Sequence, residues 1–163
     1  MKWVYKMNKP FVCTFFGHRD FNEHCKYEDI LEKILIDFIS KNDYIEFLVG
    51  RNGEFDIFVA SVIHRIKHKH GKDNFSLTLV LPYETAEYIK NQRNYENYYD
   101  DIIITEGNCH FKASIDTRNK KMIDMSDVIV CYLIKNEGGA FKASNYAKKC
   151  GKNVINIADF KDI

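Results

Sequence analysis

The residues best suited to chemistry stand in short glycine-containing segments, and the first of these is residues 17–20 (GHRD). Glycine lets a backbone approach a ligand closely, and the Arg19 guanidinium is a forked donor suited to phosphate. His18 can donate a hydrogen bond or change charge near neutral pH. A plain turn between a strand and a helix would explain the same residues. The candidate ligand-binding residues here are Gly17, His18 and Arg19.

The second segment, residues 50–56 (GRNGEFD), sets two glycines around a tight turn before a predicted helix. Backbone N–H groups and the helix dipole favour an anion there. A carboxylate beside a phosphate repels it, so Glu54 or Asp56 is better suited to ribose hydroxyls or to acid–base catalysis. Alternatively, Asp56 only caps the helix and Glu54 is only a solvated loop residue. The candidate ligand-binding residues of this turn are Gly50, Arg51, Asn52 and Gly53.

Two further segments add candidates for binding an anion. Gly138 and Gly139 open a predicted helix and can cradle an anion, or simply let that helix pack closely. Arg118 belongs to a basic run, residues 118–121, at the start of a helix that Thr117 is predicted to cap. This run either folds toward the ligand or forms an exposed first turn.

Pro82 and Tyr83 follow a predicted strand, and Tyr83 can either stack on a base or pack internally. The standard motifs of cofactor and metal chemistry are absent. No G-x-G-x-x-G follows the first strand, and the chain has no P-loop and no nucleophile elbow. His64 and His68 are four residues apart but lack the glutamate of H-E-x-x-H, and Cys109-His110 has no supporting ligands. We therefore expect neither a cofactor nor a metal.

Composition limits the class of protein. The 163 residues include 24 Lys and Arg against 23 Asp and Glu, which gives a net charge of +1. This balance argues against a nucleic-acid coat, and makes nucleic acid an unlikely partner. No apolar run reaches the roughly 18 residues that span a membrane, and the N-terminus lacks a secretory signal. Five cysteines without a C-x-x-C favour reduced thiols and a cytoplasmic location.

Short apolar runs alternate with helical periodicity along the whole chain, without a repeat or a linker. We expect one domain, residues 1–163, with an α/β Rossmann-like fold: a doubly wound, mainly parallel sheet with helices on both faces. In such folds, ligands bind outside the carboxyl ends of the strands. The expected strands are 11–16, 44–49, 76–81, 101–104, 127–133 and 154–157, and the expected helices are 26–41, 56–70, 84–93, 117–125 and 138–150.

Taken together, the ordered motifs resemble the YpsA-like branch of the SLOG superfamily, a group also described as a domain of unknown function. The resemblance extends from about residue 10 to residue 158. The segments that carry it are 13–19 (CTFFGHR), 47–56 (FLVGRNGEFD), 81–83 (LPY), 118–120 (RNK) with Met122 and Asp124, and 138–140 (GGA).

The resemblance implies a Rossmann-like fold with a nucleotide or nucleotide-derived ligand. The superfamily includes LOG-type phosphoribohydrolases, DNA-uptake proteins related to DprA, and domains that sense signalling nucleotides in antiphage defence. This chain departs from the LOG motif P-G-G-x-G-T-x-x-E, because Glu137 precedes its glycine pair and Ala140 follows it. The catalytic glutamate of that motif has no match. Arg51 stands where the branch commonly has glycine, and Ala143 where it commonly has threonine.

Three functions remain open from the sequence. The favoured one is a nucleotide-binding module: a sensor, carrier or sequestering protein, in which basic residues and glycines hold phosphates, a carboxylate meets the ribose and Tyr83 meets the base. The alternative is an N-glycosidic hydrolase using Glu54 or Asp56 near the ribose. DNA binding ranks third. Relatives often form dimers, so a homodimer is expected. The aromatic segment 91–99 is expected to be a lid, a subunit contact or a packed polar loop.

Overall fold

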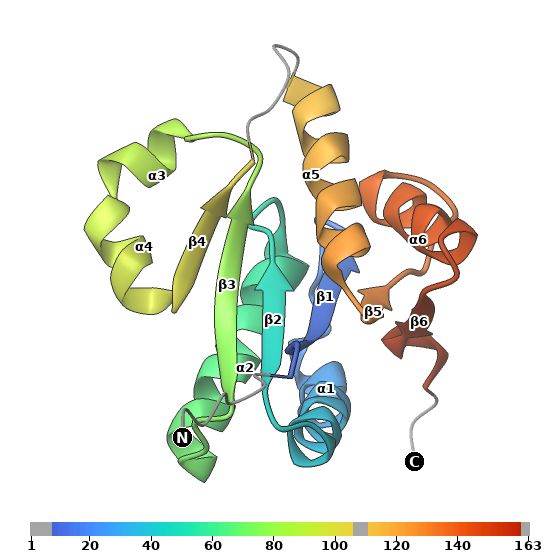
Figure 1. Ribbon diagram of the computed structural model, residues 1–163. Helices are drawn as coiled ribbons and strands as arrows, with labels where there is room; N and C mark the ends of the chain where they lie inside the picture. Colours follow the sequence, from blue (N-terminus) through green and yellow to red (C-terminus); the bar gives the residue numbers. More distant parts are fainter. Residues whose placement is uncertain (1–7, 106–110, 161–163) are drawn as a thin grey trace, which may run out of the picture.

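The computed structural model describes residues 8–105 and 111–160. In this part of the chain six strands form one parallel sheet, shown in Figure 1. The strands are β1 (Phe11–Gly17), β2 (Ile45–Val49), β3 (Phe75–Leu81), β4 (Asp101–Ile104), β5 (Val128–Tyr132) and β6 (Asn153–Asn156).

Strand order in the sheet is β4-β3-β2-β1-β5-β6. The chain first builds outward from β1 to β4, and then returns to add β5 on the other side of β1. The direction of building therefore reverses between β1 and β5, where Cys13 lies opposite Val128 and Gly17 opposite Tyr132. This topology confirms the expected doubly wound Rossmann-like fold, and it predicts a ligand crevice at the carboxyl ends of these two strands.

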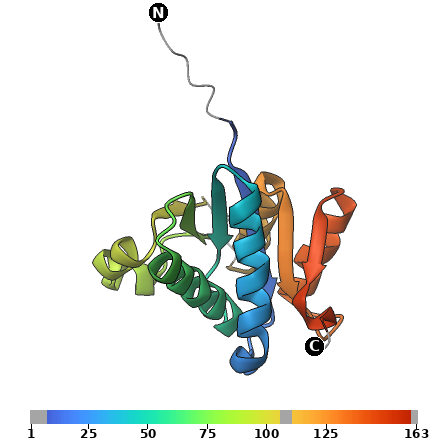
Figure 2. The same ribbon diagram turned by 90° about the horizontal axis from the view of Figure 1, so that it is seen from below.

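Helices cover both faces of the sheet. They are α1 (His24–Lys41), α2 (Glu54–His70), α3 (Ala86–Lys90), α4 (Gln92–Tyr98), α5 (Phe111–Met125) and α6 (Gly139–Lys149), with a 3-10 turn at Ile157–Asp159. Figure 2 shows α3 and α4 beyond the β4 edge of the sheet, while α6 and β6 lie at the opposite edge.

Successive residues of the central strands enter two different hydrophobic clusters. Phe15 of β1 packs with side chains of α1 and α2, whereas its neighbour Phe16 packs with side chains of α5 and α6. The same alternation separates Phe47 from Leu48 in β2. This is the pattern of a parallel sheet buried on both faces, because successive side chains point to opposite sides of a strand.

Helices α1, α2 and α5 begin earlier in the sequence than expected, and in α2 and α5 this changes the role of a predicted cap residue. Helix α5 begins at Phe111, so Thr117 is not its cap; the Thr117 hydroxyl instead donates to the Ala113 carbonyl, one turn back within the helix. Helix α2 begins at Glu54 with Gly53 as its N-cap, which places Asp56 inside the first turn. The prediction that these two side chains cap helices was therefore wrong.

The aromatic segment 91–99 is largely helical. The region predicted as one helix, residues 84–93, divides near Asn91 into α3 and α4. Tyr95 and Tyr99 are buried, and each ring packs against another tyrosine. These two tyrosines anchor α4 to the rest of the molecule.

The described cysteines are free thiols. Cys13 and Cys131 are buried in the sheet, as their apolar sequence context predicted, and Cys25 and Cys150 are exposed. Burial raises the pKa of Cys13 well above its usual value, and that of Cys131 to about 12, so both buried thiols stay protonated. Cys109 and His110 lie outside the described residues. Within those residues, no helix is both long enough and apolar enough to cross a membrane.

Candidate functional site

A pocket of about 330 Å³ opens at the carboxyl ends of β1 and β2. Four parts of the chain line it: the end of β1 with the residues after it, the turn before α2, one side of α5, and the start of α6. Of the residues chosen from sequence, those that line the pocket are Gly17, His18, Arg19, Gly50, Asn52, Gly53, Asp56, Arg118, Gly138 and Gly139.

Arg118 is the most deeply buried cation of the pocket wall, with only 3% of its surface exposed. Its Nη1 donates to the Val80 carbonyl (3.2 Å) and its Nε to Oδ1 of Asn119 (3.0 Å). Burial lowers the Arg118 pKa, and the nearby Asp56 charge acts in the opposite direction. An arginine keeps its charge despite such shifts, so the pocket holds a fixed cation.

Asp56 brings a carboxylate into the same pocket. Its Oδ2 accepts a hydrogen bond from the Asn52 backbone N–H (2.9 Å), so the carboxylate already binds the turn before α2. Burial raises the Asp56 pKa, while this hydrogen bond and the Arg118 charge lower it. The Asp56 carboxylate would repel an anionic group of a ligand at the start of α2. This side of the pocket is therefore better suited to ligand hydroxyl groups.

Two glycines let the parts of the pocket approach one another. A Cβ on Gly17 would lie 2.2 Å from the ring of Phe55, a fully buried residue of α2. A Cβ on Gly50 would lie 2.6 Å from Nη1 of Arg118 and 3.2 Å from Oδ2 of Asp56. We expected glycine to admit a ligand at these segments; at these two positions it admits protein atoms instead.

His18 joins the end of β1 to the loop that precedes α6. Its Nε2 accepts hydrogen bonds from the backbone N–H groups of Ile134 (3.0 Å) and Lys135 (3.2 Å). The ring must be neutral at Nε2 to accept them. Burial and the Lys135 charge lower the His18 pKa, while Glu137 acts in the opposite direction.

The same loop is held from its other side by Asn156. Its Oδ1 accepts from the Leu133 N–H (3.0 Å), and its Nδ2 donates to the Leu133 carbonyl (2.9 Å). The loop then reaches Gly138, which has a φ of +90° that favours glycine and which forms the N-cap of α6. No side chain caps α6, so its first N–H groups are open to an anion.

Arg51 and Glu54 do not line the pocket. The Arg51 guanidinium donates to the Tyr99 hydroxyl (3.2 Å), pairs with Glu87 (3.6 Å) and lies 4.8 Å from the centre of the Tyr95 ring. It therefore connects the turn before α2 to α3 and α4.

Glu54 connects the same turn to the segment after β1. Its N–H donates to the Arg19 carbonyl (2.9 Å), and its Oε2 accepts from the Phe21 N–H (3.3 Å). Pro82 and Tyr83 also lie outside the pocket lining: Pro82 is buried, and Tyr83 packs edge-on against Phe111.

Six pocket residues were not candidates from the sequence: two lie in β1, three in α5 and one at the start of α6. Asn119 was quoted only as part of a motif, although its amide lines the pocket beside Arg118. A predicted helix beginning at residue 111 would have revealed the pocket residues of α5. In such a helix, Ile115, Arg118, Asn119 and Met122 fall on one face at helical spacing. The pocket residues not singled out as candidates are Phe15, Phe16, Ile115, Asn119, Met122 and Ala140.

No metal site emerges among the residues that the structure describes, since no cluster of three His, Cys, Asp or Glu side chains could hold an ion. His64 stacks on the Tyr98 ring, with 4.1 Å between centroids, and its Nε2 lies 2.7 Å from the Tyr98 carbonyl.

Comparison with known proteins defines the class of fold. No family model and no curated sequence matches the chain. Solved structures do match: DNA processing protein A from Helicobacter pylori (TM-score 0.61, 13% identity) and DprA from Streptococcus pneumoniae (TM-score 0.62, 14% identity). Each match covers 89% of this chain, which spans 64% of the first protein and 49% of the second. The shared feature is the Rossmann-like fold.

This comparison corrects one expectation. Nucleic acid was considered an unlikely partner because the net charge is +1. That inference is wrong, because the neighbours with this fold are DNA processing proteins, and the Helicobacter pylori structure is described for its single-stranded DNA binding mode. Net charge averages over the whole surface, whereas binding depends on the charges at one site.

Proposed function

We propose that this chain is a nucleotide-binding module of the YpsA-like branch of the SLOG superfamily, and that its ligand is a nucleotide, either free or within a nucleic-acid strand. The observation that carries the proposal is the buried Arg118 guanidinium in a pocket that also contains the uncapped start of α6. A fixed cation and open backbone N–H groups in one concave site suit a phosphate.

The remaining pocket residues suit the other parts of a nucleotide. Arg19 is exposed at the pocket and can reach a phosphate held at Gly138 and Gly139. Asp56 and the Asn119 amide can bind ribose hydroxyls, because a carboxylate accepts and an amide both donates and accepts. The pocket volume lies at the lower end of the range for small-molecule sites, which fits one nucleotide unit. By the family resemblance, the proposal includes a cytoplasmic homodimer.

Titration calorimetry tests the proposal with four ribonucleoside monophosphates and a 12-residue oligothymidylate. We expect at least one of these ligands to bind, and Arg19→Ala to weaken its affinity by about 10-fold to 100-fold, the loss of a charged hydrogen bond of about 1.5–3 kcal/mol. Arg93→Ala removes the same charge from α4, outside the pocket lining, and should bind like the parent chain. Absence of binding by every ligand, or equal binding by the Arg19 variant, would refute the proposal.

N-glycosidic hydrolysis is a second candidate, supported by Asp56. Of the two carboxylates considered from sequence, only Asp56 lines the pocket, and burial raises its pKa, as a general acid requires. Chromatography of nucleoside monophosphates after incubation with the protein tests this function. Release of free base that Asp56→Asn abolishes would support it, and unchanged nucleotide would exclude these substrates.

A further inference from the structure

A second cavity, of about 180 Å³, adjoins the nucleotide pocket. It lies between α5 and α6, and the two cavities share Asn119 and Gly139 in their walls. The two cavities are therefore adjacent, with Asn119 in the wall of each. The polar side chains that line the second cavity are Asp116, Asn119, Lys120, Lys142 and Tyr146.

Two lysines face this cavity from opposite helices, Lys120 from α5 and Lys142 from α6. Both are exposed, and neither forms an ion pair with a carboxylate in the described part of the chain. The Lys120 ammonium lies 5.6 Å from the centre of the Tyr146 ring. The Tyr146 hydroxyl in turn donates to Asp124 (2.8 Å), so that carboxylate is occupied by the tyrosine.

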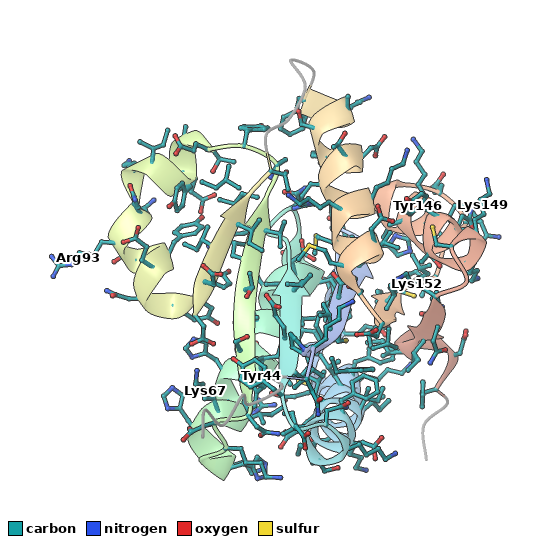
Figure 3. The ribbon with its side chains drawn as sticks, in the orientation of Figure 1. Tyr44, Lys67, Arg93, Tyr146, Lys149 and Lys152 are labelled. Carbon is teal, nitrogen blue, oxygen red and sulfur yellow. The ribbon has the colours of Figure 1, made fainter. Side chains whose placement is uncertain are left out.

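The surrounding chain is basic although the whole molecule is nearly neutral. Residues 111–152 contain nine Lys and Arg against four Asp and Glu. Figure 3 places Tyr146, Lys149 and Lys152 together around α6, at the edge of the molecule opposite Arg93. An anion approaching α5 and α6 thus meets a local positive field that the net charge conceals.

We propose that the cavity between α5 and α6 binds a second phosphate group of the ligand whose nucleotide occupies the first pocket. This assignment rests on the proposed function. Lys120 and Lys142 hold the phosphate between them as point charges, and Asn119 contacts both ligand parts. The second phosphate comes either from the phosphate chain of a nucleoside diphosphate or from the next nucleotide of a strand.

Asp116 is the negatively charged side chain that lines this cavity, so its removal tests whether the bound group is an anion. Its carboxylate repels a phosphate there, so Asp116→Asn should strengthen binding of a two-phosphate ligand by several-fold. A gain in affinity is informative because a merely damaged fold would lower affinity instead. The mononucleotide, which does not reach this cavity, should bind the variant and the parent chain equally.

The main experiment compares one nucleotide with two extended forms of it. Calorimetry measures the affinity of the best-binding monophosphate, its diphosphate and its 5′-phosphorylated dinucleotide. We expect at least one extended form to bind about tenfold more tightly than the monophosphate. The double variant K120Q/K142Q should lose this advantage while keeping its affinity for the monophosphate. The matched control K121Q/K149Q removes the same charge from the same helices, outside the cavity lining, and should keep the advantage.

The outcomes distinguish failure of the second phosphate subsite from failure of the proposed nucleotide-binding function. An advantage for the diphosphate alone identifies a phosphate chain, and one for the dinucleotide alone identifies a strand. For a strand, loss of both lysines should also reduce the magnitude of the slope of log affinity against log salt by about 0.7, because together they neutralise one phosphate. If the monophosphate binds but no extended form binds better, or if both double variants lose the advantage equally, the second subsite is refuted. If no nucleotide binds at all, the proposed function and this subsite fail together.

Discussion

Replacing Gly50 by alanine tests whether this glycine exists to admit Arg118. The new Cβ would lie 2.6 Å from Nη1 and 3.1 Å from Cζ of Arg118, closer than carbon and nitrogen atoms can pack. The guanidinium is the end of a flexible side chain, so it can move aside. However, it is buried and bonded to the Val80 carbonyl and to Asn119, so moving it breaks at least the bond that Nη1 donates.

That broken bond sets the magnitude. A hydrogen bond from a charged donor contributes about 1.5–3 kcal/mol to stability, and Gly50→Ala should lower the free energy of unfolding by this amount. For a domain of this length, the melting temperature should fall by about 3–12 °C. Because Arg118 also lines the pocket, nucleotide affinity should decrease as well. Denaturant unfolding followed by circular dichroism measures the first effect, and calorimetry the second.

A double-mutant cycle shows whether the cost passes through Arg118. Arg118→Met shortens the side chain and removes the atom that the new Cβ would meet, so Gly50→Ala should then cost much less than in the parent chain. Gly139→Ala is the control for adding a methyl group at the pocket, since nothing lies within 4 Å of its Cβ position, and it should change stability by less than about 0.5 kcal/mol. Equal costs of Gly50→Ala with and without Arg118 would refute the reasoning.

Two further predictions concern pH. The folded chain lowers the His18 pKa from its usual value of 6.5. The neutral ring therefore contributes its full stability above pH 6.5, and this stability is lost as the pH falls through the lower pKa of the folded chain. Thermal unfolding between pH 5 and 8 should show this loss, and a His18→Gln variant that keeps the same pH dependence would contradict it. The folded chain raises the Asp56 pKa above 3.8, so the charged carboxylate destabilises the fold at neutral pH. Asp56→Asn should therefore melt at a higher temperature than the parent chain at pH 7, with a difference that shrinks toward pH 4; a variant that melts lower at pH 7 would count against this assignment.

The apolar runs in the sequence were sufficient to predict the strands of the sheet, because parallel strands that are buried on both faces are continuous apolar runs. The boundaries of α5 were less accessible, since Asp116 and Thr117 interrupt the apolar pattern and resemble the start of a helix. In the structure, Thr117 bonds within the helix. The error left two environments open for Arg118, a position facing the ligand or an exposed first turn, and the structure shows that Arg118 is buried.

Local sequence also could not determine which polar residues face the pocket. Arg51 and Arg118 are equally suited to phosphate by residue type, but only Arg118 lines the pocket, because three residues distant in sequence, Glu87, Tyr95 and Tyr99, hold Arg51 elsewhere. Glu54 and Asp56 are two positions apart in α2 and point in different directions for that reason alone. Their separation follows once the helix is known to begin at Glu54.

The reversal of strand order also has a consequence for how the chain folds during synthesis. One wall of the pocket is encoded before residue 57 and the other after residue 114, and β1, which contributes to the first wall, pairs with the late strand β5. Until β5 leaves the ribosome, β1 has unpaired N–H and C=O groups along one side, an edge that can pair with another chain. Contacts so distant in sequence also form slowly. The ligand site is therefore among the last parts of this molecule to form. A chain that stops before β5 would lack a complete site, and its β1 would remain an unpaired edge strand that can associate with other chains.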